Sequence, residues 1–272
     1  MPIKLAIAGA AGRTGQRIVA LATMDREVRV VAALDNAQGK ALGTDAGELG
    51  GVGRIGVAVA DRCEVEYDVL IDFSLPRGTM QWVAECCRRS RPIVIGTTGH
   101  AEEDLRRIHE ASKLIPVLKA PNMSVGVNVL LRLAEQLGAT LDASYDVEIT
   151  EAHHRFKADA PSGTALAMKD AVCRGRQAAG GPMPPVVHGR HGQTGERPAG
   201  QIGMHSLRIG DTIGEHSVAF GNLGETITLY HVANSRDTFA AGALRAAKWI
   251  VGHPAGLYTM QNVLFGGPPM TA

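Results

Sequence analysis

The first half of the chain alternates short apolar runs with longer segments of helical periodicity. Apolar runs bounded by turn residues are typical of buried strands, and the segments between them have the apolar spacing of amphipathic helices. Strands are predicted over residues 3–8, 28–34, 67–73, 92–95 and 115–118, and helices over residues 16–24, 78–89 and 102–113. This alternation predicts an α/β fold with a parallel, doubly wound sheet.

The second half is richer in strands. After a helix predicted over residues 124–141, strands are expected over residues 145–151, 186–188, 202–208, 214–219 and 225–232, and a long helix follows over residues 235–251. The pattern predicts a second, α+β domain on an open, mixed and largely antiparallel sheet. An open sheet with an apolar face needs a covering surface, which makes self-association plausible.

Composition and charge narrow the class of protein. With 272 residues, 45% of them hydrophobic and 20% charged, the chain suits one or two globular domains and excludes a disordered one. The net charge of +1 gives no general electrostatic case for nucleic acid or for an anionic membrane. No apolar run reaches the roughly 20 residues of a membrane span, and the strand pattern near Met1 leaves no room for a signal peptide.

The four cysteines show no C-x-x-C spacing, and the neighbours Cys86 and Cys87 are poorly placed for a disulfide. A reduced, cytoplasmic protein is therefore expected.

A glycine-rich turn follows the first predicted strand. It reads Gly9-Ala10-Ala11-Gly12-Arg13-Thr14-Gly15 and leads into a helical pattern. Strand, glycine turn and helix are the context of a Rossmann-like dinucleotide site, where backbone N–H groups meet a pyrophosphate. Arg13 is expected to lie along the phosphates. Asp35 ends the next strand, roughly twenty residues after Gly15, and is placed to accept hydrogen bonds from the adenosine ribose.

The end of a later strand adds candidates at the same edge of the sheet. Gly96-Thr97-Thr98 follows the predicted strand over residues 92–95. Ligands of doubly wound sheets bind at the carboxyl ends of the strands. Backbone and hydroxyl groups here are therefore expected to face the nicotinamide ribose and ring.

Cationic and titratable groups gather in residues 148–165, which read E-I-T-E-A-H-H-R-F-K-A-D-A-P-S-G-T-A. His153, His154, Arg155 and Lys157 can bind an anion, and a histidine there can donate a proton. Ser162-Gly163-Thr164 then opens an apolar helical pattern, and the N–H groups of a helix start form a carboxylate cradle. Adjacent histidines at a strand end and a plain N-cap are the ordinary alternatives. In combination these groups suit a dicarboxylate.

The same run resembles the signature segment of the dihydrodipicolinate reductase family, the 4-hydroxy-tetrahydrodipicolinate reductases of the lysine and diaminopimelate pathway. The resemblance extends over nearly the whole chain. It implies reduction of 4-hydroxy-tetrahydrodipicolinate to tetrahydrodipicolinate with NADH or NADPH, and a homotetramer assembled through the open sheets. It also implies a cofactor domain of residues 1–124 with 235–272, and a domain of residues 125–234 that binds substrate and oligomerises.

The resemblance implies roles residue by residue. His153 and Lys157 align with the catalytic histidine and lysine, and their roles are open to exchange. The substrate-binding positions are His154, Ser162, Gly163 and Thr164, and the cofactor positions are Gly9, Ala10, Ala11, Gly12, Arg13, Thr14, Asp35, Gly96, Thr97, Thr98, Ala120, Pro121, Asn122 and Met123. A member of the family that uses both cofactors has an arginine after the acidic residue, where this chain has Asn36. NADH is therefore expected to be used well, with NADPH less favoured, although Lys40 is a possible substitute.

Other readings of the chain stay open. Arg190 or Arg197, in the glycine-rich stretch 189–203, can approach a dicarboxylate, although a solvated loop is favoured. His188 and His191 have no further ligand at metal spacing, so no metal site is expected. A different Rossmann-like oxidoreductase would lack the H-H-x-x-K…P-S-G-T run. A non-catalytic dinucleotide sensor would keep the glycine turn and Asp35 without needing His153 and Lys157.

Overall fold

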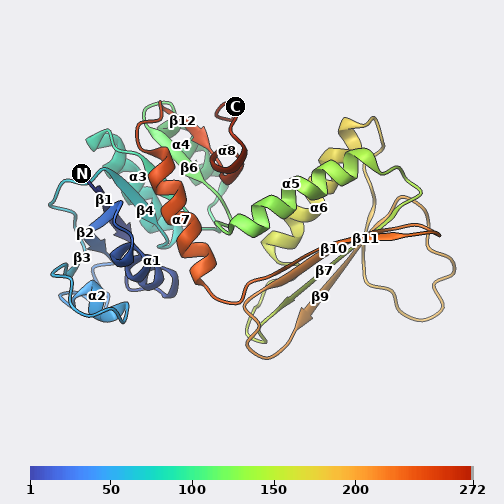
Figure 1. Ribbon diagram of the computed structural model, residues 1–272, viewed down its shortest axis with the longest axis horizontal. Helices are drawn as coiled ribbons and strands as arrows, with labels where there is room; N and C mark the ends of the chain where they lie inside the picture. The colour runs from blue at the N-terminus through green and yellow to red at the C-terminus, as the bar shows by residue number, and fades with distance from the viewer. Residues whose placement is uncertain (271–272) are drawn as a thin grey trace. The chain divides into compact units, whose positions relative to one another are not determined.

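The structure is a computed structural model that describes residues 1–270, and it divides into two compact units (Figure 1). One unit comprises residues 1–125 and 236–272, and the other comprises residues 126–235. The first unit contains a seven-stranded sheet in the order β12-β6-β5-β4-β1-β2-β3. All its strand pairs are parallel. Its strands are β1 (Ile3–Ala8), β2 (Val28–Leu34), β3 (Val59–Ala60), β4 (Val69–Asp72), β5 (Ile93–Ile95), β6 (Pro116–Lys119) and β12 (Gly256–Tyr258).

Helices cover both faces of this sheet, because the strands are apolar on both sides. On one face α1 (Arg13–Met24) packs against α7 (Asp237–Ile250), over a core that includes Ile7, Ile71 and Leu118. On the other face lie α3 (Pro76–Arg89) and α4 (Glu102–Ser112), over a core that includes Ile93 and Ile95. The short helices α2 (Ala46–Leu49) and α8 (Met260–Phe265) complete the unit. The predicted doubly wound α/β sheet is confirmed.

The second unit has a five-stranded sheet in the order β11-β10-β7-β9-β8. Its strands are β7 (Asp146–His153), β8 (Val186–His188), β9 (Ile202–Arg208), β10 (Glu215–Gly221) and β11 (Thr226–Val232). The pairs β10–β11 and β10–β7 are antiparallel, whereas β7–β9 and β8–β9 are parallel. The sheet is mixed as predicted, but the expectation that it is largely antiparallel is wrong. The long connections between β7, β8 and β9 allow strands to run in the same direction.

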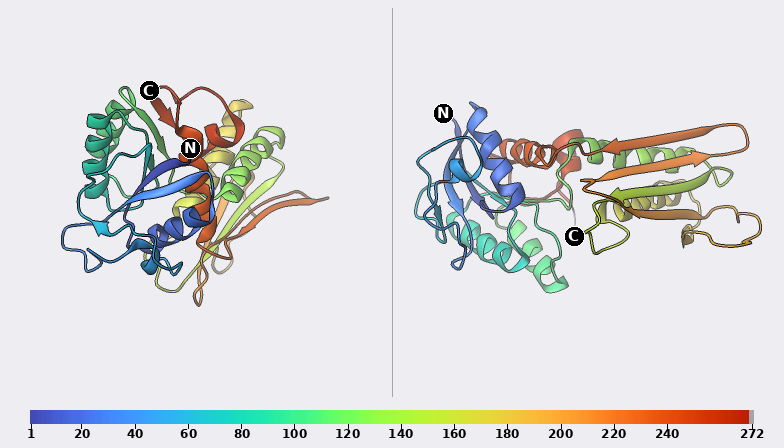
Figure 2. Two further views of the ribbon diagram at one scale, coloured as in Figure 1. Left: turned by 60° about the vertical axis from the view of Figure 1, so that its left-hand side comes forward. Right: turned by 90° about the horizontal axis from the view of Figure 1, so that it is seen from below.

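Two helices cover one face of the second sheet. These are α5 (Val125–Thr140) and α6 (Gly163–Ala178), which enclose a core of residues such as Ile149 and Phe220. The helices approach closely, since a Cβ atom at Gly175 would lie 2.1 Å from the carbonyl oxygen of Glu135. Both helices lie on the same face of this sheet (Figure 2). The other face carries exposed apolar side chains on β9 and β11, among them Leu207, Tyr230 and Val232.

The last residue of β4, Asp72, has a fully buried carboxylate that fixes the end of the strand by hydrogen bonds. Asp72 accepts hydrogen bonds from the hydroxyls of Ser74 (2.5 Å), Thr79 (2.5 Å) and Thr97 (2.9 Å), and from the Ser74 N–H (3.1 Å). These contacts join the ends of β4 and β5 to the first turn of α3. Because buried donors that lose their acceptor are costly, Asp72 stabilises this edge of the sheet.

Asp72→Ala is therefore expected to lower the free energy of unfolding by about 3 kcal/mol, since it leaves several buried donors unpaired. Urea unfolding followed by circular dichroism measures the change. The exposed Glu64 provides the matched control, and Glu64→Ala should change stability by less than about 0.5 kcal/mol. Equal stability of the two variants would contradict this role of Asp72.

Candidate active site

The glycine turn of the first unit leaves a helix start open. Gly9 has φ +75°, and a Cβ atom there would lie 2.3 Å from the carbonyl oxygen of Phe73. A Cβ atom at Gly15 would lie 2.0 Å from the carbonyl oxygen of Gly9, so the turn and the helix touch backbone to backbone. Gly12 is the N-cap of α1 and has no side chain to cap the helix. The N–H groups of the first turn, at Arg13 and Thr14, are therefore available to a phosphate.

Asp35 stands beside this turn, directly after β2. One of its carboxylate oxygens accepts the N–H of Ala11 (3.1 Å), and the other accepts the backbone N–H (2.8 Å) and the side-chain amide (3.1 Å) of Asn36. Lys40 is exposed on the loop that follows. The structure thus brings together Gly9–Thr14 and Asp35, the predicted pyrophosphate and ribose positions, and adds Asn36 as a direct partner of the carboxylate.

The predicted cofactor residues after β5, at positions 96–98, have few side-chain groups free to contact a ligand. Thr97 is buried, and its hydroxyl donates to Asp72, whereas Thr98 is exposed. The Cβ direction of Gly96 is filled by the ring of Phe73, 2.3 Å away.

The segment after β6 likewise points side chains into the protein. Ala120 and Met123 are buried in the core, and the amide oxygen of Asn122 accepts the N–H of Ser124 (2.9 Å), while Pro121 is exposed. The side chains of Ala120, Asn122 and Met123 thus have structural roles within the unit. A ligand at this segment would be contacted mainly by backbone groups.

In the second unit, two residues of the 148–165 run, His153 and Ser162, contact Glu151, a residue of the same run to which the sequence pattern assigned no role. Its carboxylate is 1% exposed and receives a two-armed ion pair from Arg208, at 2.9 and 3.0 Å. It also lies 2.6 Å from Nδ1 of His153 and accepts the N–H of Ser162 at 3.2 Å. One carboxylate thus joins the end of β7, the end of β9 and the start of α6.

These contacts set the charges of the pair. Burial would raise the pKa of Glu151, but hydrogen bonds from Arg208 and His153 outweigh it and lower the pKa to about 2. Burial also lowers the pKa of His153 below its usual value, against the opposing effect of Glu151. Near neutral pH, Glu151 is ionised and His153 is neutral. Nδ1 of His153 then donates to the carboxylate, and Nε2 carries the lone pair.

The start of α6 is a capped helix N-terminus. Ser162 is its N-cap, and the Ser162 hydroxyl oxygen accepts the N–H of Ala165 at 3.2 Å. The same hydroxyl lies 3.0 Å from Nε2 of His216, a 4% exposed side chain on β10. The Ser162 side chain is thus occupied within the protein, and Gly163 is the first residue of the helix, at the end where backbone N–H groups attract a carboxylate.

Lys157 and His154 lie on the turn between β7 and α6. The Lys157 ammonium donates to the carboxylate of Asp159 (2.8 Å), which lowers the pKa of that carboxyl. Nδ1 of His154 is buried and has no hydrogen-bond partner within residues 1–270. Lys157 is thus paired with an exposed carboxylate that a ligand carboxylate can replace, and His154 retains an unused polar atom.

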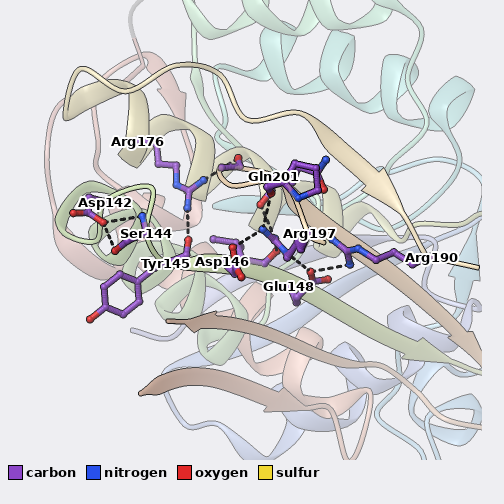
Figure 3. A network of polar contacts seen from close by, with 12 residues as sticks. Asp142, Ser144, Tyr145, Asp146, Glu148, Arg176, Arg190, Arg197 and Gln201 are labelled. Carbon is purple, nitrogen blue, oxygen red and sulfur yellow. Dashed lines mark hydrogen bonds and ion pairs between the residues drawn. The ribbon is translucent and has the colours of Figure 1, made fainter. Parts of the chain in front are cut away.

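The arginines of the 189–203 stretch form ion pairs with carboxylates of β7 (Figure 3). Arg197 binds the carboxylates of Glu148 (3.1 Å) and Asp146 (2.6 Å), and Arg190 also binds Glu148 (3.0 Å). Glu148 accepts His205 as well, at 2.7 Å. Most of the 189–203 stretch is exposed, in agreement with the favoured expectation of a solvated loop. Ion pairs fasten Arg190 and Arg197 of this loop to β7.

Two other classes of site, a metal centre and a membrane span, have no support within residues 1–270. No group of three or more His, Cys, Asp or Glu side chains in that range is placed to hold a metal ion. In the same range, no helix combines the length and the apolar composition needed to cross a membrane.

Comparison with known proteins places the chain among reductases. The family model described as dihydrodipicolinate reductase, N-terminus, matches residues 3–123, and the one described as dihydrodipicolinate reductase, C-terminus, matches residues 126–264. The 4-hydroxy-tetrahydrodipicolinate reductases of Alkalilimnicola ehrlichii and Thiobacillus denitrificans are each 45% identical to the chain, over 97% of its length and 99% of theirs.

Solved structures agree. A dipicolinate-bound dihydrodipicolinate reductase from Paenisporosarcina sp. TG-14 superimposes with a TM-score of 0.77 and 25% identity, covering 97% of this chain and all (100%) of that one. An amine dehydrogenase from Mycobacterium smegmatis, 13% identical, superimposes with a TM-score of 0.60 over 96% of this chain and 95% of its own, and shares the fold.

The buried His216 gives the second unit an acid-sensitive stability. Burial, with a smaller effect from the charge of His153, lowers its pKa to about 4. The unfolded chain therefore takes up this proton at a higher pH than the folded one. Stability from this group is complete above about pH 6.5 and is lost as the pH falls toward 4, by about 3 kcal/mol.

His216→Gln removes this titration, so its stability should fall less than that of the unsubstituted protein between pH 7 and 4. Urea unfolding at several pH values measures the difference, with the exposed His191→Gln as the matched control. Parallel pH profiles for the unsubstituted protein and His216→Gln would contradict the assignment.

Proposed function

We propose a function on the premise that the chain belongs to the dihydrodipicolinate reductase family, which matches over both halves of the chain establish. The protein is an oxidoreductase, a 4-hydroxy-tetrahydrodipicolinate reductase of lysine and diaminopimelate biosynthesis. The product is tetrahydrodipicolinate. The observation that carries its mechanism is the contact of His153 and of the start of α6 with one ionised carboxylate, Glu151.

The glycine turn fits a dinucleotide. Gly9 and Gly15 leave no room for side chains, α1 begins without a side-chain cap, and Asp35 stands at the end of β2. We infer that Gly9–Thr14 hold the pyrophosphate and Asp35 the adenosine ribose, and that the main chain at residues 96–98 and 120–123 borders the nicotinamide. When bound, the reduced nicotinamide supplies a hydride. Residues 1–124 with 235–272 would form this cofactor domain, and residues 125–234 the substrate domain.

The second unit would bind the substrate through its two carboxylates. The N–H groups of Gly163 and Thr164 receive one carboxylate, with Ser162 holding the helix start in place. Lys157 exchanges Asp159 for a substrate carboxylate, and His154 offers its unused Nδ1. A planar ring with two carboxylates is thereby held between fixed donors, which limits its orientation.

His153 would supply the proton. In the ligand-free protein it is neutral, since burial lowers its pKa. A bound dianion raises the pKa of a neighbouring imidazole, so His153 takes up a proton when the substrate binds, with Nε2 as the donor atom. The species reduced is the conjugated ring that 4-hydroxy-tetrahydrodipicolinate forms by loss of water. Hydride addition to its conjugated ring carbon leaves an anion delocalised onto the ring nitrogen, and the imidazolium protonates this anion to give tetrahydrodipicolinate. Glu151 holds the ring in this tautomer throughout.

The alternative of a non-catalytic dinucleotide sensor is less favoured. A sensor needs the glycine turn and Asp35, but it has no use for a histidine oriented by a buried, ion-paired carboxylate.

The apolar side chains on the open face of the second sheet support assembly into a homotetramer through that face. Light scattering of the purified protein tests the assembly.

His153→Ala and Lys157→Ala are expected to lower kcat/KM by at least about 100-fold each, because a proton donor and a carboxylate partner are lost. NADH oxidation measures this, with substrate made fresh by condensing pyruvate with aspartate semialdehyde. His191→Ala, an exposed histidine of the 189–203 loop, is the control and should retain full activity. Near-normal rates in both site variants would exclude the proposed mechanism.

The cofactor preference is expected to follow Asn36. Its amide binds the Asp35 carboxylate and offers no cation to a 2′-phosphate, so NADH should be used at least as well as NADPH. Asn36→Arg should shift the ratio of kcat/KM values toward NADPH by about tenfold or more, as a new charge-assisted contact would. Steady-state kinetics with both cofactors measures the ratio. A strong NADPH preference in the unsubstituted protein, abolished by Lys40→Ala, would instead assign the phosphate to Lys40.

A further inference from the structure

Gly214 borders the reactive edge of His153. Gly214 is buried and lies immediately before β10. Its carbonyl oxygen accepts the N–H of Ala233, the residue after β11, at 2.9 Å. A Cβ atom built on Gly214 would lie 3.2 Å from Nε2 of His153 and 3.5 Å from Cε1 of His216. Because position 214 has no side chain, the space next to Nε2 of His153, on the side of the ring away from Glu151, is not filled by a Cβ atom.

Neither ring can easily move aside for such an atom. His153 is held at Nδ1 by Glu151 (2.6 Å), which is itself locked by Arg208. His216 is held at Nε2 by Ser162 (3.0 Å), and the two histidine rings meet edge to face with centroids 5.1 Å apart. A methyl group at position 214 would have to displace one of these rings or cover the His153 nitrogen.

The backbone does not demand glycine at this position. Gly214 is absent from the glycines of positive φ, so its conformation is one that alanine adopts readily. Space, and not strain, is what the glycine provides. Within residues 1–270, no hydrogen-bond partner of the protein approaches Nε2 of His153.

We propose that Gly214 is an access residue: its missing side chain keeps Nε2 of His153 open to the substrate. The inference rests on the role proposed for His153, but access itself is measurable without turnover. Because Nδ1 is engaged by Glu151, an electrophile can reach the imidazole only at the edge that Gly214 leaves open.

Diethyl pyrocarbonate, which acylates accessible imidazole nitrogen, is the probe. Tandem mass spectrometry resolves the modification rate at each histidine, with the exposed His191 as the internal reference. In Gly214→Ala, the rate at His153 is expected to fall at least tenfold relative to His191. The matched control is Gly224→Ala in the turn between β10 and β11, where a Cβ atom would meet only Asn222 Oδ1, at 3.7 Å.

Activity is measured in parallel. Gly214→Ala should lower kcat/KM by about tenfold or more, since a small displacement of a reacting group has effects of that size, while Gly224→Ala should match the unsubstituted enzyme. An unchanged acylation rate at His153 in folded Gly214→Ala would overturn the proposal. Slowed acylation with full activity would instead retain the access role and reject the catalytic role of His153.

The unsubstituted protein provides a second measurement, which holds if Gly214→Ala fails to fold. His153 should be acylated many times faster than His216, which is 4% exposed, and pyridine-2,6-dicarboxylate should protect it. Equal acylation rates at His153 and His216 would show that the Gly214 side of the ring is closed, and would also overturn the proposal.

Discussion

The ion pair between Glu151 and Arg208 is the interaction on which the substrate side of this reductase depends. A buried carboxylate is costly unless it is fully paired, and Glu151 is paired on both oxygens, by Arg208, His153 and the Ser162 N–H. Because β7 and β9 run parallel in register, His153 lies opposite Arg208 at their ends. The mixed sheet thus delivers the arginine to the site, which an antiparallel pairing of these two strands would not do.

The two proposed anion sites share one arrangement. Each unit places a helix start after a strand, with α1 after β1 and α6 after β7, and each helix has a glycine in its first turn. In the first unit, Gly12 leaves the N-cap of α1 without a side chain. In the second, Ser162 turns its hydroxyl inward to His216 and Ala165. Both arrangements leave backbone N–H groups, which need no ionisation to hold a phosphate or a carboxylate.

Local sequence predicted the elements well where the apolar runs are long. The predicted bounds of β1 and β2 match the structure, whereas α1 begins at Arg13, three residues before its predicted start and within the glycine turn. β3 and β12, of two and three residues, and the short α8 were missed, because such segments have no readable period. The domain boundaries came from the family resemblance, since no composition shift marks residue 235.

The residues that support His153 and Ser162 could not be predicted from the local sequence. His153, Lys157 and the helix start lie in one contiguous run of sequence, so an anion-binding and proton-donating role could be predicted from the sequence alone. Glu151 reads as one more polar residue of that run until Arg208, 57 residues later, is placed against it. His216 lies 54 residues from Ser162 and follows only from the pairing of β10 with β7. Long-range pairings of this kind carry no signal in a single sequence.

The most direct test of this account is calorimetry of pyridine-2,6-dicarboxylate binding near pH 7, in buffers of different ionisation enthalpy. The Paenisporosarcina reductase is described as binding dipicolinate, which makes the compound a suitable probe. If the dianion charges a neutral His153, each binding event takes up a fraction of a proton, and His153→Gln abolishes the uptake. Binding without any proton uptake in the unsubstituted protein would show that His153 does not become the acid, and would contradict the mechanism.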